Sequence, residues 1–266
     1  MDKLAILINN HFNGIPMDIV NQLNDELLRQ VFTEEQKQSI RLDEYREIAS
    51  IYARIENSIA VLSDMKTNTS YVYYGGTAER LGLEKRYATK VLHSIWEEEI
   101  LKRIHPDDLL MKHLQELRFL HFQRNTPEKE RPDYHVVSHI RMCDDSGEYL
   151  PVLHRMFYIA SQSNGSVWLA LCLYNVSADT SMRSFTINSA DGQVVEFDKQ
   201  TCDPILSERE IHVLGWIDKG KKSKEIAELL YISLHTVNRH RQNILEKLHV
   251  SNSIEACRIA KELKWI

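Results

Sequence analysis

The residues best suited to recognition chemistry lie between positions 221 and 242. Asn238, Arg239 and Gln242 carry the hydrogen-bonding groups that read base edges in the DNA major groove. A second set, rich in cations and hydroxyls, is suited to phosphates, which supply affinity without sequence preference. Its members are Lys221, Lys222, Ser223, Lys224, Thr236, His240 and Arg241. The pattern predicts a surface that contacts double-stranded DNA.

Two short helices must position these side chains. The stretch from Ser223 to Leu248 reads as a helix, a turn and a second helix with a polar outer face. Ser233 stands where the second helix should begin and is a good N-cap. A wheel of 100° per residue points Val237 and Ile244 inward. The same wheel puts Arg241 near the edge of the core, so its guanidinium must extend outward to reach a phosphate.

From Leu206 to Ile266 the chain resembles the LuxR-type helix-turn-helix domain of bacterial transcription regulators. The resemblance rests on LSEREIHVLGWIDKGKKSKEIAELLYISLHTVNRHRQNILEKLHVSN. It implies an all-α domain of four helices. The second helix of the helix-turn-helix is expected to enter the major groove, and the last helix of the domain can mediate dimerisation. One departure concerns specificity: the family usually has Lys or Arg where this chain has Asn238, and Asn favours adenine edges. The target sequence therefore stays open.

The charge of the chain is concentrated in a way that suits a DNA reader. The 266 residues carry a formal net charge of −5, but residues 205–266 hold 11 Lys or Arg and 8 Asp or Glu, a net +3. The remaining residues carry a net charge of −8. No secretory signal or membrane-length apolar run is visible, so we expect a soluble cytoplasmic protein.

The sequence offers little support for catalysis or for a bound metal. The four cysteines are scattered, without a CxxC pair or a histidine at ligand spacing, which favours free thiols. P-loop, GxGxxG, HExxH and Gly-x-Ser-x-Gly motifs are absent from the sequence. We therefore assign no catalytic residue and no metal ligand, and expect a protein that is not an enzyme.

The sequence pattern near the N-terminus predicts two helices. Met17–Gln30 reads as one helix, and a second, from Thr33 to about Asn57, carries an apolar stripe that begins in earnest at Ile48. The stripe includes Ile40, Ile48, Ile51, Tyr52, Ile55 and Ile59. It either pairs with a second copy or packs on the next domain; the sequence favours the two alternatives equally.

The middle of the chain changes to strands and turns. SIAVLSDM and TSYVYY predict two strands, TAERLGLE a short helical piece, and Ala88–Arg103 a helix. IHPDD then begins a helix that ends near Arg124. Three long strands follow, at 134–143, 149–160 and 166–176, and a hairpin at 183–197 turns on a type I′ pair at Asp191 and Gly192.

From about Ile55 to Asn175 this order of elements, together with IHPDD, resembles a PAS sensor domain. The resemblance implies a small ligand as a candidate occupant between sheet and helices. His93, His113, His121 and His139 are haem-ligand candidates, but hydrogen-bonded or surface histidines are far commoner. Tyr71, Tyr73, Tyr74, Trp96 and Trp168 fit a core better than a pocket. No cofactor is therefore assigned.

The fold class that these elements predict is α+β and multidomain. We expect an N-terminal helical segment at 1–54, a PAS-like α/β sensor domain with an antiparallel sheet at 55–197, a linker at 198–204 and the all-α helix-turn-helix domain at 205–266. Ser207 and Glu210 predict a capping box at the start of the last domain, and Ser253 a cap for its last helix.

Domain order predicts the function. A dimeric transcription regulator is expected, whose PAS-like half controls the helix-turn-helix and so its reading of DNA. The alternative is a non-enzymatic sensor or adaptor whose helix-turn-helix mainly binds RNA polymerase or another regulator.

Overall fold

The computed structural model places most of the chain. It describes residues 17–33, 38–179, 181, 184–195, 206–248, 250, 252–262 and 265–266. The chain divides into two compact units, of which one is Leu23–Glu196 and the other contains the C-terminal helices. No described helix is both long enough and apolar enough to cross a membrane. The linker expected at 198–204 lies outside the described residues.

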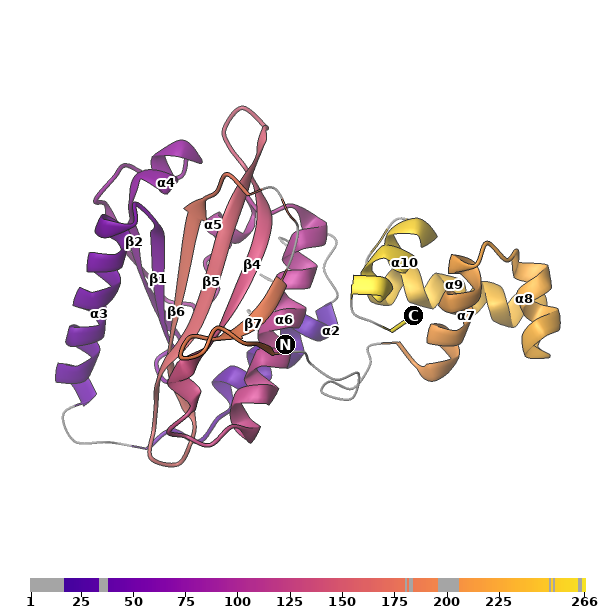
Figure 1. Cartoon of the computed structure of the whole chain (residues 1–266), viewed down its shortest axis with the longest axis horizontal. Coiled ribbons are helices and arrows are strands. Elements are labelled where there is room, and N and C mark those ends of the chain that lie inside the picture. The colour runs from indigo at the N-terminus through magenta and orange to yellow at the C-terminus, as the bar shows by residue number, and fades with distance from the viewer. Residues whose placement is uncertain are drawn as a thin grey trace. The chain divides into compact units, whose positions relative to one another are not determined.

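An antiparallel sheet forms the centre of the Leu23–Glu196 unit (Figure 1). Its strand order in the described chain is β3-β2-β1-β6-β5-β4-β7-β8. The strands are β1 Ile59–Asp64, β2 Thr69–Tyr74, β3 Thr89–Leu92, β4 Tyr134–Cys143, β5 Tyr149–Ser161, β6 Val167–Val176, β7 Ser184–Asn188 and β8 Val194–Val195. The α+β fold class is confirmed, and the antiparallel sheet is of the kind that the PAS resemblance implies.

Helices accompany the sheet in the order that the sequence predicts, with one exception. They are α2 Met17–Leu28, α3 Gln38–Ile55, α4 Gly76–Arg80, α5 Glu98–Leu101 and α6 Pro106–Asn125. The helix predicted over Ala88–Arg103 is wrong for its first part, and only Glu98–Leu101 is α-helical. Thr89–Leu92 instead pairs with β2, with Tyr73 opposite Thr89 and Ser70 opposite Leu92. Tertiary pairing at a free sheet edge overrides the helical spacing of a few apolar residues.

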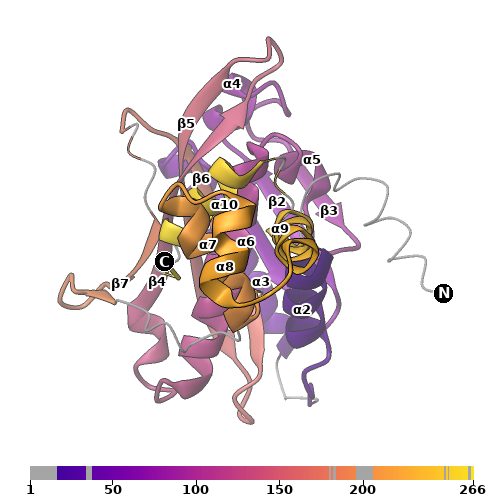
Figure 2. The same cartoon turned by 90° about the vertical axis from the view of Figure 1, so that its right-hand side faces the viewer.

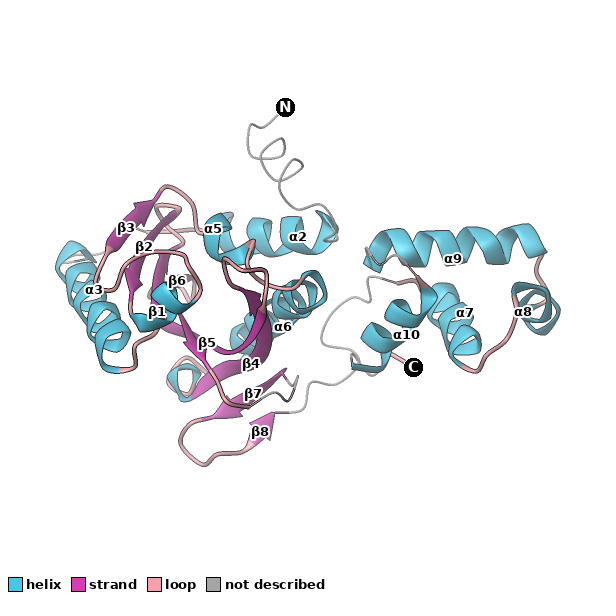
Figure 3. Ribbon diagram, turned by 90° about the horizontal axis from the view of Figure 1, so that it is seen from above, coloured by secondary structure: helices cyan, strands magenta, loops and turns pink. Residues whose placement is uncertain are grey.

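Each face of the sheet is covered by a different helix. Figure 3 shows α3 on one face and α6 on the other. On the α3 side, Ala49 and Ala53 pack on Leu62 and Trp168 in a buried apolar cluster. The small alanine side chains let the helix backbone approach the strands closely. The α3 helix is therefore part of the sheet-containing unit, so the boundary expected at residue 54 does not separate two compact bodies.

The apolar stripe of α3 does not face the sheet. Ile48, Ile51 and Tyr52 are 42%, 46% and 42% exposed, and Ile55 at the helix end is 77% exposed. A different face of the helix packs on the sheet, with Leu42, Tyr45, Ala49 and Ala53. Of the two alternatives for the stripe, packing on the neighbouring sheet is wrong for these four residues.

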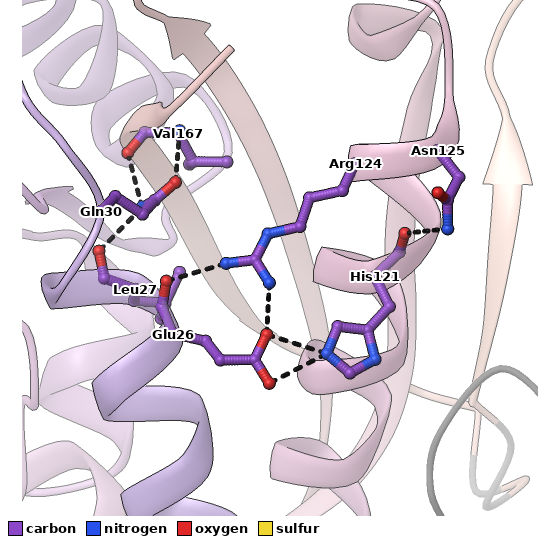
Figure 4. Close-up of polar contacts among 7 residues, drawn as sticks. All are labelled: Glu26, Leu27, Gln30, His121, Arg124, Asn125 and Val167. Carbon is purple, nitrogen blue, oxygen red and sulfur yellow. Dashed lines mark hydrogen bonds and ion pairs between the residues drawn. The ribbon is translucent and has the colours of Figure 1, made fainter. Parts of the chain in front are cut away.

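Polar contacts hold α2 against the opposite side of the unit (Figure 4). The Glu26 carboxylate lies 2.8 Å from His121 Nε2 and also pairs with Arg124, both on α6. The Gln30 side chain donates to the Val167 carbonyl at 3.2 Å and accepts from its N–H at 2.8 Å. The C-terminal half of α2 is thus fastened to α6 through Glu26, and Gln30, just after the helix, is fastened to the start of β6.

Two local predictions have different outcomes. Pro106 begins α6 as expected, and His105 Nδ1 accepts from the Asp107 N–H at 3.3 Å as its cap. The β7–β8 hairpin is confirmed, but its type I′ turn is wrong. Gly192 has φ +76°, whereas Asp191 is not among the positive-φ residues. A type I′ turn needs two consecutive positive-φ residues, and here the loop runs from Ser189 to Gln193.

The histidines considered as haem ligands have ordinary surroundings. His93 is exposed. Each of the other three contacts a carboxylate: His113 with Glu116, His121 with Glu26 and His139 with Asp179. These are the hydrogen-bonded histidines that the sequence favours.

Candidate nucleic-acid interface

Four helices form the C-terminal unit, and the first begins as predicted. They are α7 Glu208–Asp218, α8 Ser223–Leu230, α9 Leu234–Leu248 and α10 Ser253–Glu262 (Figure 2). The Ser207–Glu210 capping box is confirmed: the Ser207 N–H donates to Glu210 at 2.7 Å, and Ser207 Oγ accepts from the Glu210 N–H at 3.3 Å. The same carboxylate accepts from Lys247 Nζ at 2.8 Å, which fastens α7 to α9.

This contact decides the charge state of Glu210. Burial alone would raise the pKa of the carboxyl group, but the bonds from Lys247 and Ser207 outweigh it and lower the pKa. Glu210 therefore stays ionised at neutral pH and keeps both helices in place.

The inner faces of α8 and α9 meet as the helical wheel predicts. Ile226, Val237, Ile244 and Leu248 are all at most 1% exposed, and Ala227 is 9% exposed. Figure 3 shows α9 along its length, with α7, α8 and α10 on one side of it. With one face of α9 buried in this way, its other face is left for recognition.

The turn between the two helices fixes where α9 begins. Ser233 caps α9, as predicted, by accepting from the Thr236 N–H at 3.0 Å. Tyr231, which ends α8, adopts the left-handed conformation at φ 54° and ψ 43°. Its side chain is 95% exposed, so few contacts offset the strain of that conformation in a residue with a Cβ.

Replacing Tyr231 with glycine is expected to stabilise the C-terminal unit by about 0.5–1 kcal/mol, because glycine adopts this conformation without strain. Urea denaturation of the two proteins measures the difference. Glu228→Gly, placed inside α8, is the matched control and should destabilise by about 1 kcal/mol. A destabilised Tyr231→Gly protein would contradict the prediction.

The three predicted base-reading residues lie on the exposed face of α9. Asn238, Arg239 and Gln242 are all exposed. The Gln242 amide donates to Glu246 one turn later at 2.9 Å, which leaves its second N–H and its carbonyl oxygen for a base edge. The geometry therefore presents two amides and a guanidinium together on the side of α9 away from Val237.

The predicted phosphate-contacting residues divide into two groups. Lys222 and Lys224 are exposed. The other five are partly buried, and four of them have partners within the unit. Lys221 pairs with Glu225 at 3.0 Å and Thr236 Oγ1 lies 2.8 Å from Ser233 Oγ, while Ser223 and Arg241 bond each other. For His240, the Nδ1 atom is buried without a partner among the described residues.

Arg241 links three helices. Its guanidinium donates to Ser223 Oγ at the start of α8 at 3.4 Å and to Ser253 Oγ at the start of α10 at 3.2 Å. The cap predicted at Ser253 is wrong: Asn252 Oδ1 accepts from the backbone N–H groups of Ile254 and Glu255, both at 3.0 Å. Arg241 occupies the Ser253 hydroxyl instead.

Apolar residues outside the predicted set of site residues are exposed around the turn. Leu229, Tyr231 and Leu234 are 44%, 95% and 47% exposed. Their exposure could have been predicted from the sequence, because all three residues fall outside the inward positions of the helical wheel.

A capped helix, a turn and a second helix with a buried inner face and a hydrogen-bonding outer face define a helix-turn-helix DNA-binding domain. Residues 204–260 match the model of the family described as bacterial regulatory proteins, luxR family. This part of the chain is therefore a LuxR-type helix-turn-helix domain, and the resemblance seen in the sequence is confirmed.

Curated relatives share a limited part of their length with this chain. The oxygen regulatory protein NreC of Staphylococcus carnosus is 35% identical over 90 residues, which are 33% of this chain and 42% of that protein. The transcriptional activator protein EsaR of Pantoea stewartii subsp. stewartii is 36% identical over 89 residues, 33% of this chain and 36% of EsaR. The chain thus spans less than half of each relative.

Solved structures also align. A phage VqmA–DPO complex has 12% identity and a TM-score of 0.30, over 86% of this chain and 92% of VqmA. Escherichia coli SdiA has 15% identity and a TM-score of 0.25, over 93% of this chain and 97% of SdiA.

Proposed function

We propose that this protein is a transcription regulator that places α9 in the DNA major groove and reads bases with Asn238, Arg239 and Gln242. The observation that carries the proposal is the two-sided character of α9. One face is buried by Val237 and Ile244, and the opposite face presents two amides and a guanidinium. These are the groups that pair with adenine and guanine edges.

Phosphate contacts supply the remaining affinity. Lys222 and Lys224 are exposed near the start of α8, where cations can neutralise phosphates and release counterions. Lys221, Ser223, Thr236, His240 and Arg241 complete the proposed set. Arg241 bonds Ser223 and Ser253 in the free protein, and its remaining N–H groups are the donors proposed for a phosphate.

Arg239→Ala should weaken binding to the preferred site by about 1–3 kcal/mol and relax base preference at one position, because the substitution removes a base contact. The preferred site is first selected from random DNA, and affinities are then measured by fluorescence anisotropy. Lys224→Ala is the matched control. It should weaken binding to all sequences alike and reduce the salt dependence.

Unchanged affinity and base preference in Arg239→Ala would contradict this assignment. If the full chain also selected no DNA motif but bound RNA polymerase, the adaptor alternative would replace the proposal.

We further propose that the protein acts as a homodimer in the bacterial cytoplasm. One helix-turn-helix makes few contacts, and two copies on a two-fold site raise affinity through effective concentration. The exposed stripe Ile48, Ile51, Tyr52 and Ile55 supports α3 as the pairing surface, since its spacing is that of a two-helix seam. The apolar side of α10 is the competing surface.

The PAS-like unit is proposed to control this pairing. Because α3 packs directly on the sheet through Ala49 and Ala53, a change in the sheet's interior alters the helix that presents the stripe. A signal received by the PAS-like unit would then shift the population between dimers with paired helix-turn-helix domains and monomers. The division into 1–54, 55–197, 198–204 and 205–266 is kept as a proposal for the functional parts of the chain.

A further inference from the structure

Three side chains that bind metals converge inside the sheet-containing unit. They are Glu116 on α6, His154 on β5 and Cys172 on β6, all buried, and their ligand atoms lie within 4.8 Å of one another. The strand register explains the approach. His154 is opposite Tyr174 and Met156 is opposite Cys172, so His154 and Cys172 are diagonal neighbours on one face. The α6 helix covers that face and supplies the carboxylate.

His154 provides an independent reason to expect a ligand. Its side chain is completely buried, and neither ring nitrogen has a hydrogen-bond partner among the described residues. Buried polar atoms are nearly always paired, because leaving one unpaired forfeits its hydration without return. A buried imidazole with both nitrogens unpaired can offer a ring nitrogen lone pair to a metal ion.

We propose that Glu116, His154 and Cys172 bind a divalent transition-metal ion of the zinc class. A sulfur, a nitrogen and an oxygen ligand suit Zn²⁺ or Co²⁺ and do not suit Mg²⁺ or Ca²⁺, which prefer oxygen alone. At bond lengths of about 2.0–2.3 Å, tetrahedral ligand atoms stand roughly 3.5 Å apart. Small side-chain rotations of about 1 Å therefore close the cluster around an ion.

A neighbouring cavity offers a fourth ligand position. Glu116 and Cys172 line it together with Lys112, Tyr158 and Glu97. A water or a small exogenous donor can complete a tetrahedral site from this side. Such an open position is typical of metal sites that bind a further molecule.

Lys112 is the apparent obstacle, because a cation beside a metal is unfavourable. Its Nζ donates to Glu116 Oε1 at 2.7 Å, and His113 Nδ1 lies 3.4 Å from Oε2. An ionised carboxylate has about four lone-pair sites, so Glu116 can keep these bonds while it binds the ion. Lys112 and His113 then orient the ligand, as outer partners of metal ligands commonly do.

The test uses the full chain, stripped with a chelator, dialysed and titrated with Co²⁺ and then Zn²⁺ without DNA. We expect one ion per chain, the visible absorption of tetrahedral Co²⁺ and a sulfur-to-cobalt charge-transfer band. Cys172→Ser should lose that band and bind roughly 100-fold more weakly or worse. Cys143→Ser, on β4 and outside the cluster, is the matched control and should bind like the unmodified protein.

His154→Leu is the variant that separates metal binding from folding. It removes two unpaired polar atoms from the interior, so it should fold at least as well as the unmodified chain while losing the ion. Retention of Co²⁺ with unchanged affinity in His154→Leu overturns the proposal. So does a spectrum of the unmodified chain without sulfur charge transfer, which decides the matter even if the variants fold poorly.

Discussion

Ile51→Asp is expected to convert the protein to a monomer and to weaken binding to a two-fold DNA site by about 10²-fold or more. The substitution places a charge in the middle of the exposed stripe of α3, between Ile48 and Ile55. Burying an unpaired carboxylate at a helix seam is prohibitive, so the copies separate. The helix-turn-helix of each copy then binds its half-site independently. The DNA affinity gained from the high effective concentration of a linked second domain is lost.

The measurement pairs sedimentation velocity with DNA affinity on a full site and on a half-site. Half-site affinity should not change, because Ile51 belongs to the sheet-containing unit and the base readers to α9. Ser50→Asp is the matched control, since it adds the same charge to α3 one residue away on the other flank. It should leave the dimer intact.

A dimer that persists in Ile51→Asp would move the pairing surface to α10. The stripe would then need a different partner. A monomeric variant with full affinity for the two-fold site would instead contradict the proposal that pairing supports DNA reading.

Local signals made the helix-turn-helix predictable from the sequence. The capping box at Ser207 and Glu210 and the cap at Ser233 each act within four residues of the chain, so the printed sequence contains the whole interaction. The inward face of α9 follows from the helical period alone. The cap at Asn252 was missed because two adjacent polar residues compete for one role, and Arg241 takes Ser253 from far along the chain.

Long-range pairing limited the prediction of the sheet unit. Thr89–Leu92 became a strand only because β2 has a free edge beside it. The cluster of Glu116, His154 and Cys172 is invisible to ligand spacing, since antiparallel register and a helix crossing bring distant residues together. One signal was present: His154 occupies an inward position of β5 between Val152 and Met156, where an apolar residue is expected.

Removal of the charge at Lys112 should destabilise the sheet-containing unit by about 3–5 kcal/mol. Lys112 and Glu116 are only 4% and 7% exposed in their side chains and pair at 2.7 Å. In Lys112→Met the Glu116 carboxylate stays buried without its counter-charge, which is the costly way to break such a pair. Urea denaturation, followed by circular dichroism, measures the loss. Lys102→Met, which breaks an exposed pair with Glu98, should cost at most about 1 kcal/mol.

The pH dependence separates this cause from simple loss of packing. In the native protein burial would raise the pKa of Glu116, but Lys112 and His113 outweigh burial and hold it well below its ordinary value. Its contribution to stability is therefore present above the unfolded pKa of about 4.3 and is lost only in strong acid. Without Lys112, burial dominates and the folded pKa rises above the unfolded one. The variant should then bind a proton on folding, so its stability should fall as pH rises from about 4.3.

A second substitution completes the test of the buried pair. Lys112→Met combined with Glu116→Met replaces both charges with apolar side chains and should recover most of the lost stability, because no unpaired charge remains. A double variant as unstable as Lys112→Met would show that shape, not charge, decides the stability of this interior. Recovery of stability in the double variant would instead mean that folding does not require the ionised pair of Lys112 and Glu116. Such a pair is expected where the two groups are retained to hold a ligand.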